Sequence, residues 1–78
     1  MSSNLDRALA ALHSGRAPFS VAEYTRGDGV RCRLPLVNWQ ILWITPPTER
    51  LLRGWWADYP DAVVGIVMPD GEAWEVLT

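Results

Sequence analysis

The chain has 78 residues, of which 49% are hydrophobic, and a net charge of −2. This length leaves room for one domain, residues 1–78, because a unit of this size buries only about 60% of the surface that its unfolded chain exposes. The composition is far from that of disordered chains, so we expect a folded domain. The single cysteine excludes an internal disulfide, a cysteine-based zinc site and a paired redox motif, so we expect a reducing, cytoplasmic location.

The N-terminal segment predicts a helix over residues 4–14. Its apolar side chains recur at i, i+3, i+4 and i+7 and form one stripe, made of Leu5, Ala8, Leu9 and Leu12. Ser3 or Asn4 is suited to cap the first turn, and Gly15 is a common residue type just past a helix end. We therefore expect an amphipathic helix that packs one face against the core.

A β-hairpin is expected next. Residues 19–25 and 30–34 read as two strands, and the sequence Arg-Gly-Asp-Gly at 26–29 is typical of the turn between them. On the second strand apolar residues alternate with Arg31 and Arg33. The hairpin is therefore expected to have a basic outer face.

Residues 37–45 are predicted as a third strand. Its odd positions hold Val37, Trp39, Ile41 and Trp43. We expect these to face the core, because Asn38 and Gln40 occupy the other face. Leu42 and Ile44 also fall on that other face, and they leave an apolar patch there if no helix covers it.

A second helix is predicted from the segment Thr-Pro-Pro-Thr-Glu at 45–49 to about Tyr59. A threonine hydroxyl caps such a start, proline suits the first turn, and Pro60 ends the helix. The best apolar stripe consists of Leu51, Leu52, Trp55 and Tyr59. Because adjacent helical residues point about 100° apart, Trp56 then lies at the edge of this stripe or outside it.

Two further strands complete the expected fold. Residues 62–68 form the nearly continuous apolar run of a central strand, residues 69–72 read as a turn with Gly71 at positive φ, and residues 73–77 form the last strand. The order α-β-β-β-α-β-β predicts an α+β fold, with an antiparallel sheet of about five strands and two helices on one face. The second face is then open to solvent or to a partner.

No segment predicts a signal peptide or a membrane span. The N-terminus lacks a basic region followed by an apolar stretch. The longest apolar run, residues 62–68, is far shorter than the roughly 20 residues that cross a bilayer. We therefore expect no membrane partner.

The sequence carries no signature of catalysis. His13 is the one histidine and falls in the last turn of the first helix, where the helix dipole favours a positive charge. Cys32 has no neighbouring histidine or helix start to activate its thiol. The carboxylates fall in turns and in the last hairpin, which indicates a solvated acidic face. We expect a protein that is not an enzyme and that binds no cofactor or metal.

Charge is distributed unevenly along the chain. Residues 1–53 hold all seven basic residues, each an arginine, against four acids, which gives a net charge of +3. Residues 54–78 hold five acids and no basic residue, which gives −5. An uneven charge distribution creates a directional electric field, which favours partners whose surface charge is complementary. The acidic segment therefore predicts that the partner is a larger protein or nucleoprotein complex with a basic surface.

The tryptophans beside these acids indicate where that partner binds. Trp56, flanked by Asp58 and Asp61, is predicted to be an exposed anchor of the type enriched at interface hot spots. The alternative is that it covers the rim of a small core. The predicted partner-binding residues are Trp55, Trp56, Asp58, Asp61, Asp70, Glu72 and Glu75.

Three other functions stay open. Arg26, Arg31 and Arg33 line the hairpin with Tyr24 nearby, which suits phosphate binding and base stacking, so direct nucleic-acid binding is the main alternative. The net negative charge argues against it, and the same arginines can pair with acids of the same hairpin. An enzyme subunit or antitoxin-like cap, and a homodimer that buries Trp56 or a strand edge, are the other two.

In general type the chain resembles the small anti-CRISPR proteins encoded by phages and mobile elements. The resemblance covers its size, the α-β-β-β-α-β-β order and the acidic C-terminal third. Those proteins are short, often acidic, single-domain α+β inhibitors that block a basic nucleic-acid-binding surface of an effector complex. The resemblance implies an inhibitor of nucleic-acid recognition. It rests on no shared motif, so no functional residue carries over.

Overall fold

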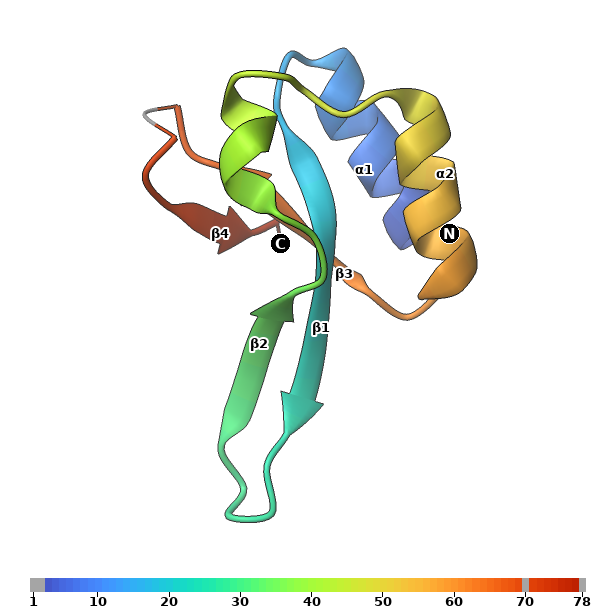
Figure 1. Ribbon diagram of the computed structural model, residues 1–78. Coiled ribbons are helices and arrows are strands. Elements are labelled where there is room, and N and C mark those ends of the chain that lie inside the picture. Colours follow the sequence, from blue (N-terminus) through green and yellow to red (C-terminus); the bar gives the residue numbers. More distant parts are fainter. Residues whose placement is uncertain (1–2, 70, 78) are drawn as a thin grey trace.

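The computed structural model describes residues 3–69 and 71–77 and has an α+β fold (Figure 1). Along the chain lie α1 (Asn4–His13), β1 (Pro18–Thr25), β2 (Arg31–Pro35), the 3-10 helix η1 (Trp39–Trp43), α2 (Glu49–Asp58), β3 (Val63–Val67) and β4 (Trp74–Val76). The four strands form one antiparallel sheet in the order β2-β1-β3-β4. The predicted class, two helices with an antiparallel sheet, is confirmed.

The prediction of a third strand over residues 37–45 is wrong, and the sheet has four strands rather than five. This segment folds instead as η1, which has about three residues per turn. Trp39 and Leu42 therefore point the same way and both pack against the core cluster around Phe19. In a strand these two side chains would have pointed to opposite faces.

The helices α1 and α2 cover one face of the sheet, as predicted. Ala8 and Ala11 of α1 and Leu52 of α2 pack against Val64 and Ile66 of β3. Their contact with the sheet forms one of two clusters of buried residues. Both helices lie on the same side of β1, with η1 on the other side (Figure 1).

The second face of the sheet is covered rather than open. Leu42 of η1 packs there with Phe19, Val21 and Val67. The ring of Trp74 meets the ring of Phe19 edge to face, with centroids 5.5 Å apart and planes at 76°, a favourable geometry for two aromatic quadrupoles. The predicted apolar patch made of Leu42 and Ile44 is therefore only half present: Leu42 is buried, whereas Ile44 is 82% exposed.

The buried stripe of α2 differs from the predicted one. Leu51 and Tyr59 are 47% and 54% exposed, whereas Leu52 and Trp56 are buried. The indole Nε1 of Trp56 donates a hydrogen bond of 2.9 Å to the carbonyl of Ala62, so the polar atom of the ring is satisfied inside the core. Leu52, Trp55 and Trp56, at i, i+3 and i+4, are the residues that join α2 to the core.

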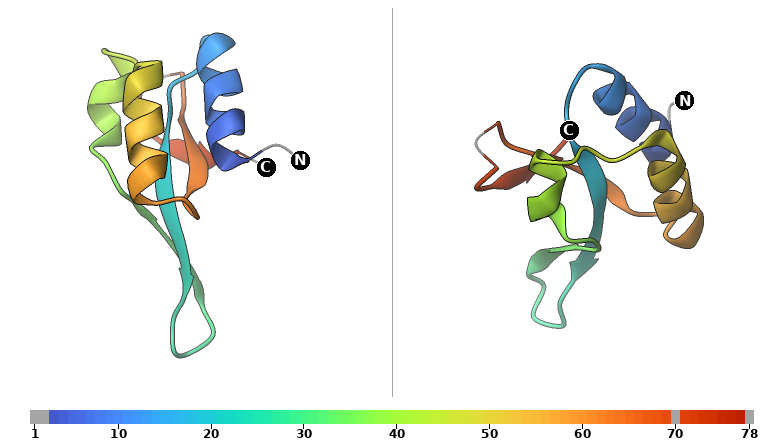
Figure 2. Two further views of the ribbon diagram at one scale, coloured as in Figure 1. Left: turned by 90° about the vertical axis from the view of Figure 1, so that its right-hand side faces the viewer. Right: turned by 45° about the horizontal axis from the view of Figure 1, so that its top comes forward.

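The hairpin of β1 and β2 projects from the body of the molecule, as all three views show (Figures 1 and 2). Residues 21–25 pair with β2, but β3 pairs only with residues 18–21 of β1. At the tip, Arg26 N–H donates to the carbonyl of Val30 (2.8 Å), and Gly29 adopts φ +85°. The predicted turn at 26–29 is confirmed.

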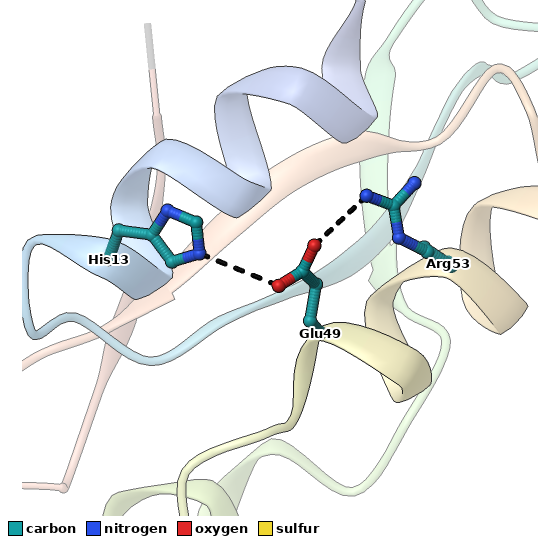
Figure 3. A network of polar contacts seen from close by, with 3 residues as sticks. All are labelled: His13, Glu49 and Arg53. Carbon is teal, nitrogen blue, oxygen red and sulfur yellow. Dashed lines mark hydrogen bonds and ion pairs between the residues drawn. The ribbon is translucent and has the colours of Figure 1, made fainter.

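The two helices are linked at one end by an exposed polar network (Figure 3). A carboxylate oxygen of Glu49, at the start of α2, lies 3.7 Å from Nε2 of His13 at the end of α1, and Arg53 Nη2 donates to the other oxygen at 2.9 Å. The hydrogen bond from Arg53 holds the pKa of Glu49 below its ordinary value, and the charge of His13 acts in the same direction. Exposed pairs of this type stabilise a fold only modestly.

Candidate interaction surface

The predicted anchor, Trp56, does not lie on the surface. Its side chain is 4% exposed and belongs to the cluster beneath α1 and α2. The expectation of an exposed anchor is therefore wrong, and the alternative of a core residue holds. Trp55 is half-buried and contacts both core clusters, so its ring also serves mainly to join the two sides of the fold.

The acids of the C-terminal third do not form one face. Asp58 and Asp61 are exposed at the end of α2 and in the loop that follows it. Glu72 and Glu75 are exposed in the β3–β4 hairpin, on the opposite side of the molecule from that end of α2 (Figure 1). Asp70 lies outside the described residues. The structure thus brings Asp58 and Asp61 together and separates them from Glu72 and Glu75.

The projecting hairpin has one apolar face. Residues opposite each other in the register share a face, and these pairs include Ala22 with Leu34 and Tyr24 with Cys32. Tyr24 and Leu34 are 49% and 54% exposed. The other face carries the charged pair of Glu23 with Arg33. The hairpin therefore presents a row of exposed apolar side chains on a single side.

This apolar face is continuous with the helix-covered side of the sheet. Ser20 and Ala22 are two apart on β1 and so point the same way, and Ser20 pairs with Val64, which lies beneath the helices. Leu36, just past β2, packs against the same cluster. The helices cover this face of the sheet only as far as the end of α2, and beyond that point the same face is exposed on the hairpin.

A hollow of about 260 Å³ lies at this junction. Its lining includes Ala22, Leu36, Asp58, Tyr59, Pro60 and Asp61. Tyr59 was predicted to be a core residue, but its exposed ring forms part of this wall. We name the combined area the corner surface, and its members are Ala22, Tyr24, Leu34, Asp58, Tyr59 and Asp61.

The two aspartates of the corner surface make no ion pair that would stabilise the described part of the fold. Asp58 is in the last turn of α2, where the helix dipole is negative and a carboxylate is unfavourable. Among residues 3–69 and 71–77, neither Asp58 nor Asp61 has a hydrogen-bond or ion-pair partner from its side chain. By contrast, Glu23 on the rim of the hollow pairs with Arg33 at 3.0 Å. Two unpaired negative charges therefore flank an apolar hollow.

The hairpin arginines are largely occupied by acids of the same hairpin. Arg33 pairs with Glu23 across the strands, and Arg26 pairs with Asp28 at 3.2 Å. Arg31 has no carboxylate partner in the described part of the chain. Tyr24 lies on the face opposite Arg31 and Arg33, since those arginines pair with Thr25 and Glu23. Arg31 and Arg33 are thus not combined with Tyr24 on one face of the hairpin.

A second exposed apolar area lies on η1. Ile41, Trp43 and Ile44 are exposed there, and a hollow of about 390 Å³ lies beside Trp43. Trp43 packs over Gly71, where an added Cβ would come within 2.6 Å of the indole. Residues 36–48 contain no charged side chain. The charges beside this area come instead from Arg16 and Glu75, which also line the hollow and are of opposite sign.

Neither a metal-ligand cluster nor a membrane-spanning helix is found among the described residues. Within 3–69 and 71–77, no three His, Cys, Asp or Glu side chains are placed to hold a metal ion. The thiol of Cys32 donates a long hydrogen bond of 3.8 Å to the carbonyl of Val30. In the same part of the chain, neither helix has the length and apolar character needed to cross a bilayer.

Part of the corner surface has a signal in the sequence. The alternation of residues 30–34 identifies an apolar face of the hairpin, and the two aspartates were among the predicted binding residues. The contribution of Tyr59 was missed, because its spacing from Leu51 also fits a core stripe. No protein-family model, curated protein or solved structure matches this chain.

Proposed function

We propose that the protein is a small, non-enzymatic interaction module that binds a basic surface of a larger partner through the corner surface. The observation that supports this most directly is the pair of unpaired aspartates beside an apolar hollow that continues onto an exposed hairpin face. Charges of this type guide the approach of an oppositely charged partner. The apolar side chains of the corner surface, with Tyr24 and Tyr59, supply the area that is buried on binding. Asp58 also sits where it is unfavourable for the helix, which a role in binding explains.

The partner class is a protein or nucleoprotein complex that handles nucleic acid. Such proteins bear the basic surfaces that phosphates occupy, and the carboxylates of Asp58 and Asp61 match the sign of phosphate. An inhibitor of the anti-CRISPR type, which occupies the nucleic-acid-binding surface of an effector complex, is the specific form that we propose. Binding of the protein and binding of nucleic acid to the partner would then exclude each other.

The test is affinity capture of the tagged protein from nuclease-treated lysate of the cells that encode it. We expect Asp58→Lys/Asp61→Lys to lose the partner. Glu72→Lys/Glu75→Lys changes the net charge equally on the other side of the molecule and serves as the matched control. Retention of the partner by the first variant, or equal loss by both, would contradict the assignment to the corner surface.

The apolar part of the surface is tested with a second matched pair. Leu51→Ala removes a half-exposed side chain from α2 and Tyr59→Ala removes one from the residue that follows α2, but only Tyr59 lines the hollow. We expect Tyr59→Ala to weaken binding to the captured partner by about 1–2 kcal/mol and Leu51→Ala to have little effect. Equal effects would show that the aromatic wall is not part of the interface. Added nucleic acid should displace the wild-type protein from the partner.

A further inference from the structure

The strand β1 has an edge that no other strand of the described chain uses. Beyond Val21, where pairing with β3 stops, the residues of β1 pair only with β2. The start of β3 at Val63 marks the place where the chain turns away toward α2 (Figure 1). The lower half of β1 is thus paired on one side and open on the other.

The hydrogen bonds fix which residues face this open edge. Leu36 N–H donates to the carbonyl of Ser20 at 3.0 Å, so the even residues of β1 turn their peptide groups toward β2. Val67 N–H donates to the carbonyl of Ala17 at 3.1 Å, so the odd residues turn theirs toward β3. Because this alternation continues along an antiparallel ladder, Glu23 and Thr25 present their N–H and C=O groups at the open edge.

The outer edge of β2 is protected in a way that the β1 edge is not. Arg31 and Arg33 place their peptide groups there, and Pro35 at its end has no N–H. Charged residues and proline at an edge discourage pairing with another chain. The ion pair of Glu23 with Arg33 offsets one charge on each edge, which leaves Arg31 and Pro35 to protect the β2 edge, whereas Thr25 on the β1 edge favours strand structure. Of the two hairpin edges, the one beside the corner surface is the better template.

We propose that the partner binds by strand addition: an extended segment with lysine or arginine at alternate positions pairs with the β1 edge at Glu23 and Thr25. This inference rests on the proposed function and specifies its geometry. Alternate side chains of an added strand fall on the side of Ala22, which is the side of the hollow. Their methylene stems cover Ala22 and Tyr59, and their charged ends reach Asp58 and Asp61. Main-chain bonds supply affinity and the alternating side chains supply specificity.

The probe is a peptide of about eight residues in which lysine and valine alternate, with a block peptide of the same composition as control. Amide exchange of the isotope-labelled full chain is followed by NMR. We expect the alternating peptide to slow exchange at Glu23 and Thr25 by at least about tenfold and to leave Arg31 and Arg33 unchanged. The block peptide should protect neither pair of amides. Protection at Arg31 and Arg33, protection nowhere, or equal effects of both peptides overturns the proposal.

Two proline variants locate the edge in the intact protein. Thr25 and Arg31 face each other in the register, and the N–H of each points away from the hairpin ladder. Thr25→Pro removes a donor from the proposed edge, and Arg31→Pro removes the equivalent donor from the outer edge of β2. We expect Thr25→Pro to weaken peptide binding by about fivefold to tenfold and Arg31→Pro to change it by less than about twofold. Equal effects overturn strand addition, whereas the capture experiment with Asp58→Lys/Asp61→Lys decides the proposed function separately.

Discussion

The carbonyl of Ala62 offers a sharp test of how the core is held together. It accepts two hydrogen bonds of 2.9 Å, one from the indole Nε1 of Trp56 and one from the side-chain amide of Asn4. These bonds tie the start of α1 and the end of α2 to the chain just before β3. Because the carbonyl has two partners, loss of either one leaves it satisfied.

We therefore predict that Trp56→Phe and Asn4→Ala are strongly non-additive. Each single change removes one hydrogen bond, at a cost of about 1 kcal/mol, and Trp56→Phe adds a packing term of about 1 kcal/mol. The double variant leaves the carbonyl of Ala62 without a side-chain partner, which adds about 1–3 kcal/mol of desolvation penalty. The expected total is about 4–6 kcal/mol.

Urea unfolding of the four proteins in a double-mutant cycle measures this coupling. The comparison requires two-state unfolding, which is checked by coincident transitions in fluorescence and circular dichroism and by equal denaturant slopes across the set. A loss of unfolding free energy in the double variant that equals the sum of the two single losses, to within about 0.5 kcal/mol, would contradict the predicted coupling. It would mean that solvent or a backbone shift satisfies the carbonyl when both donors are gone.

Three further predictions concern single residues. Asp58→Asn should raise the free energy of unfolding by about 0.3–1 kcal/mol, measured by urea unfolding, because it removes a negative charge from a helix C-terminus. Gly65→Ala should lower the thermal midpoint, measured by circular dichroism, because the new Cβ would lie 2.7 Å from Cζ of Phe19, and overpacking costs about 1–3 kcal/mol. Folding lowers the pKa of Glu49, so its stabilisation is present above the ordinary glutamate pKa and is lost as pH falls through the folded value. In Glu49→Gln, the free energy of unfolding should therefore fall less steeply as the pH is lowered through the acidic range, which urea unfolding at a series of pH values measures.

Local signals were sufficient for most of the fold. The turn at 26–29 needed a residue at positive φ, and Gly29 supplies it. The first helix begins at a capping box in which Ser3 and Asp6 bond to each other's backbone N–H, an interaction between near neighbours in sequence. The apolar run that forms β3 does not show the helical spacing of apolar residues that would favour a helix over a strand. Each of these elements is determined by residues close together in the chain.

The third predicted strand failed because its pattern fits two structures. Alternating apolar residues at Trp39, Ile41 and Trp43 suit a strand, but Trp39 and Leu42 also suit one face of a 3-10 helix. The choice depends on long-range packing: the cluster around Phe19 needs a cover on the second face of the sheet, and η1 supplies it. No short stretch of sequence contains that information.

The prediction of which side chains of α2 face the core was wrong for a related reason. Leu51 and Leu52 are adjacent, as are Trp55 and Trp56, so two overlapping stripes have the same spacing. The buried one is selected by the carbonyl of Ala62, which gives the Trp56 indole a hydrogen-bond acceptor inside the core. A contact with a residue beyond the helix thus determines its orientation, and periodicity within the helix could not predict it.

The proposed location of the binding surface rests on features that do not stabilise the fold. Asp58 opposes the helix dipole, Tyr59 leaves a half-exposed ring, and the edge at Glu23 and Thr25 presents unpaired peptide groups. Any one of these could occur alone on the surface of a small protein. Glu23, Asp58 and Tyr59 line one hollow. A single partner segment would contact all three of these features together. Local departures from what stability favours are expected to gather where a protein binds, and here they gather on the corner surface rather than at the exposed side chains of η1.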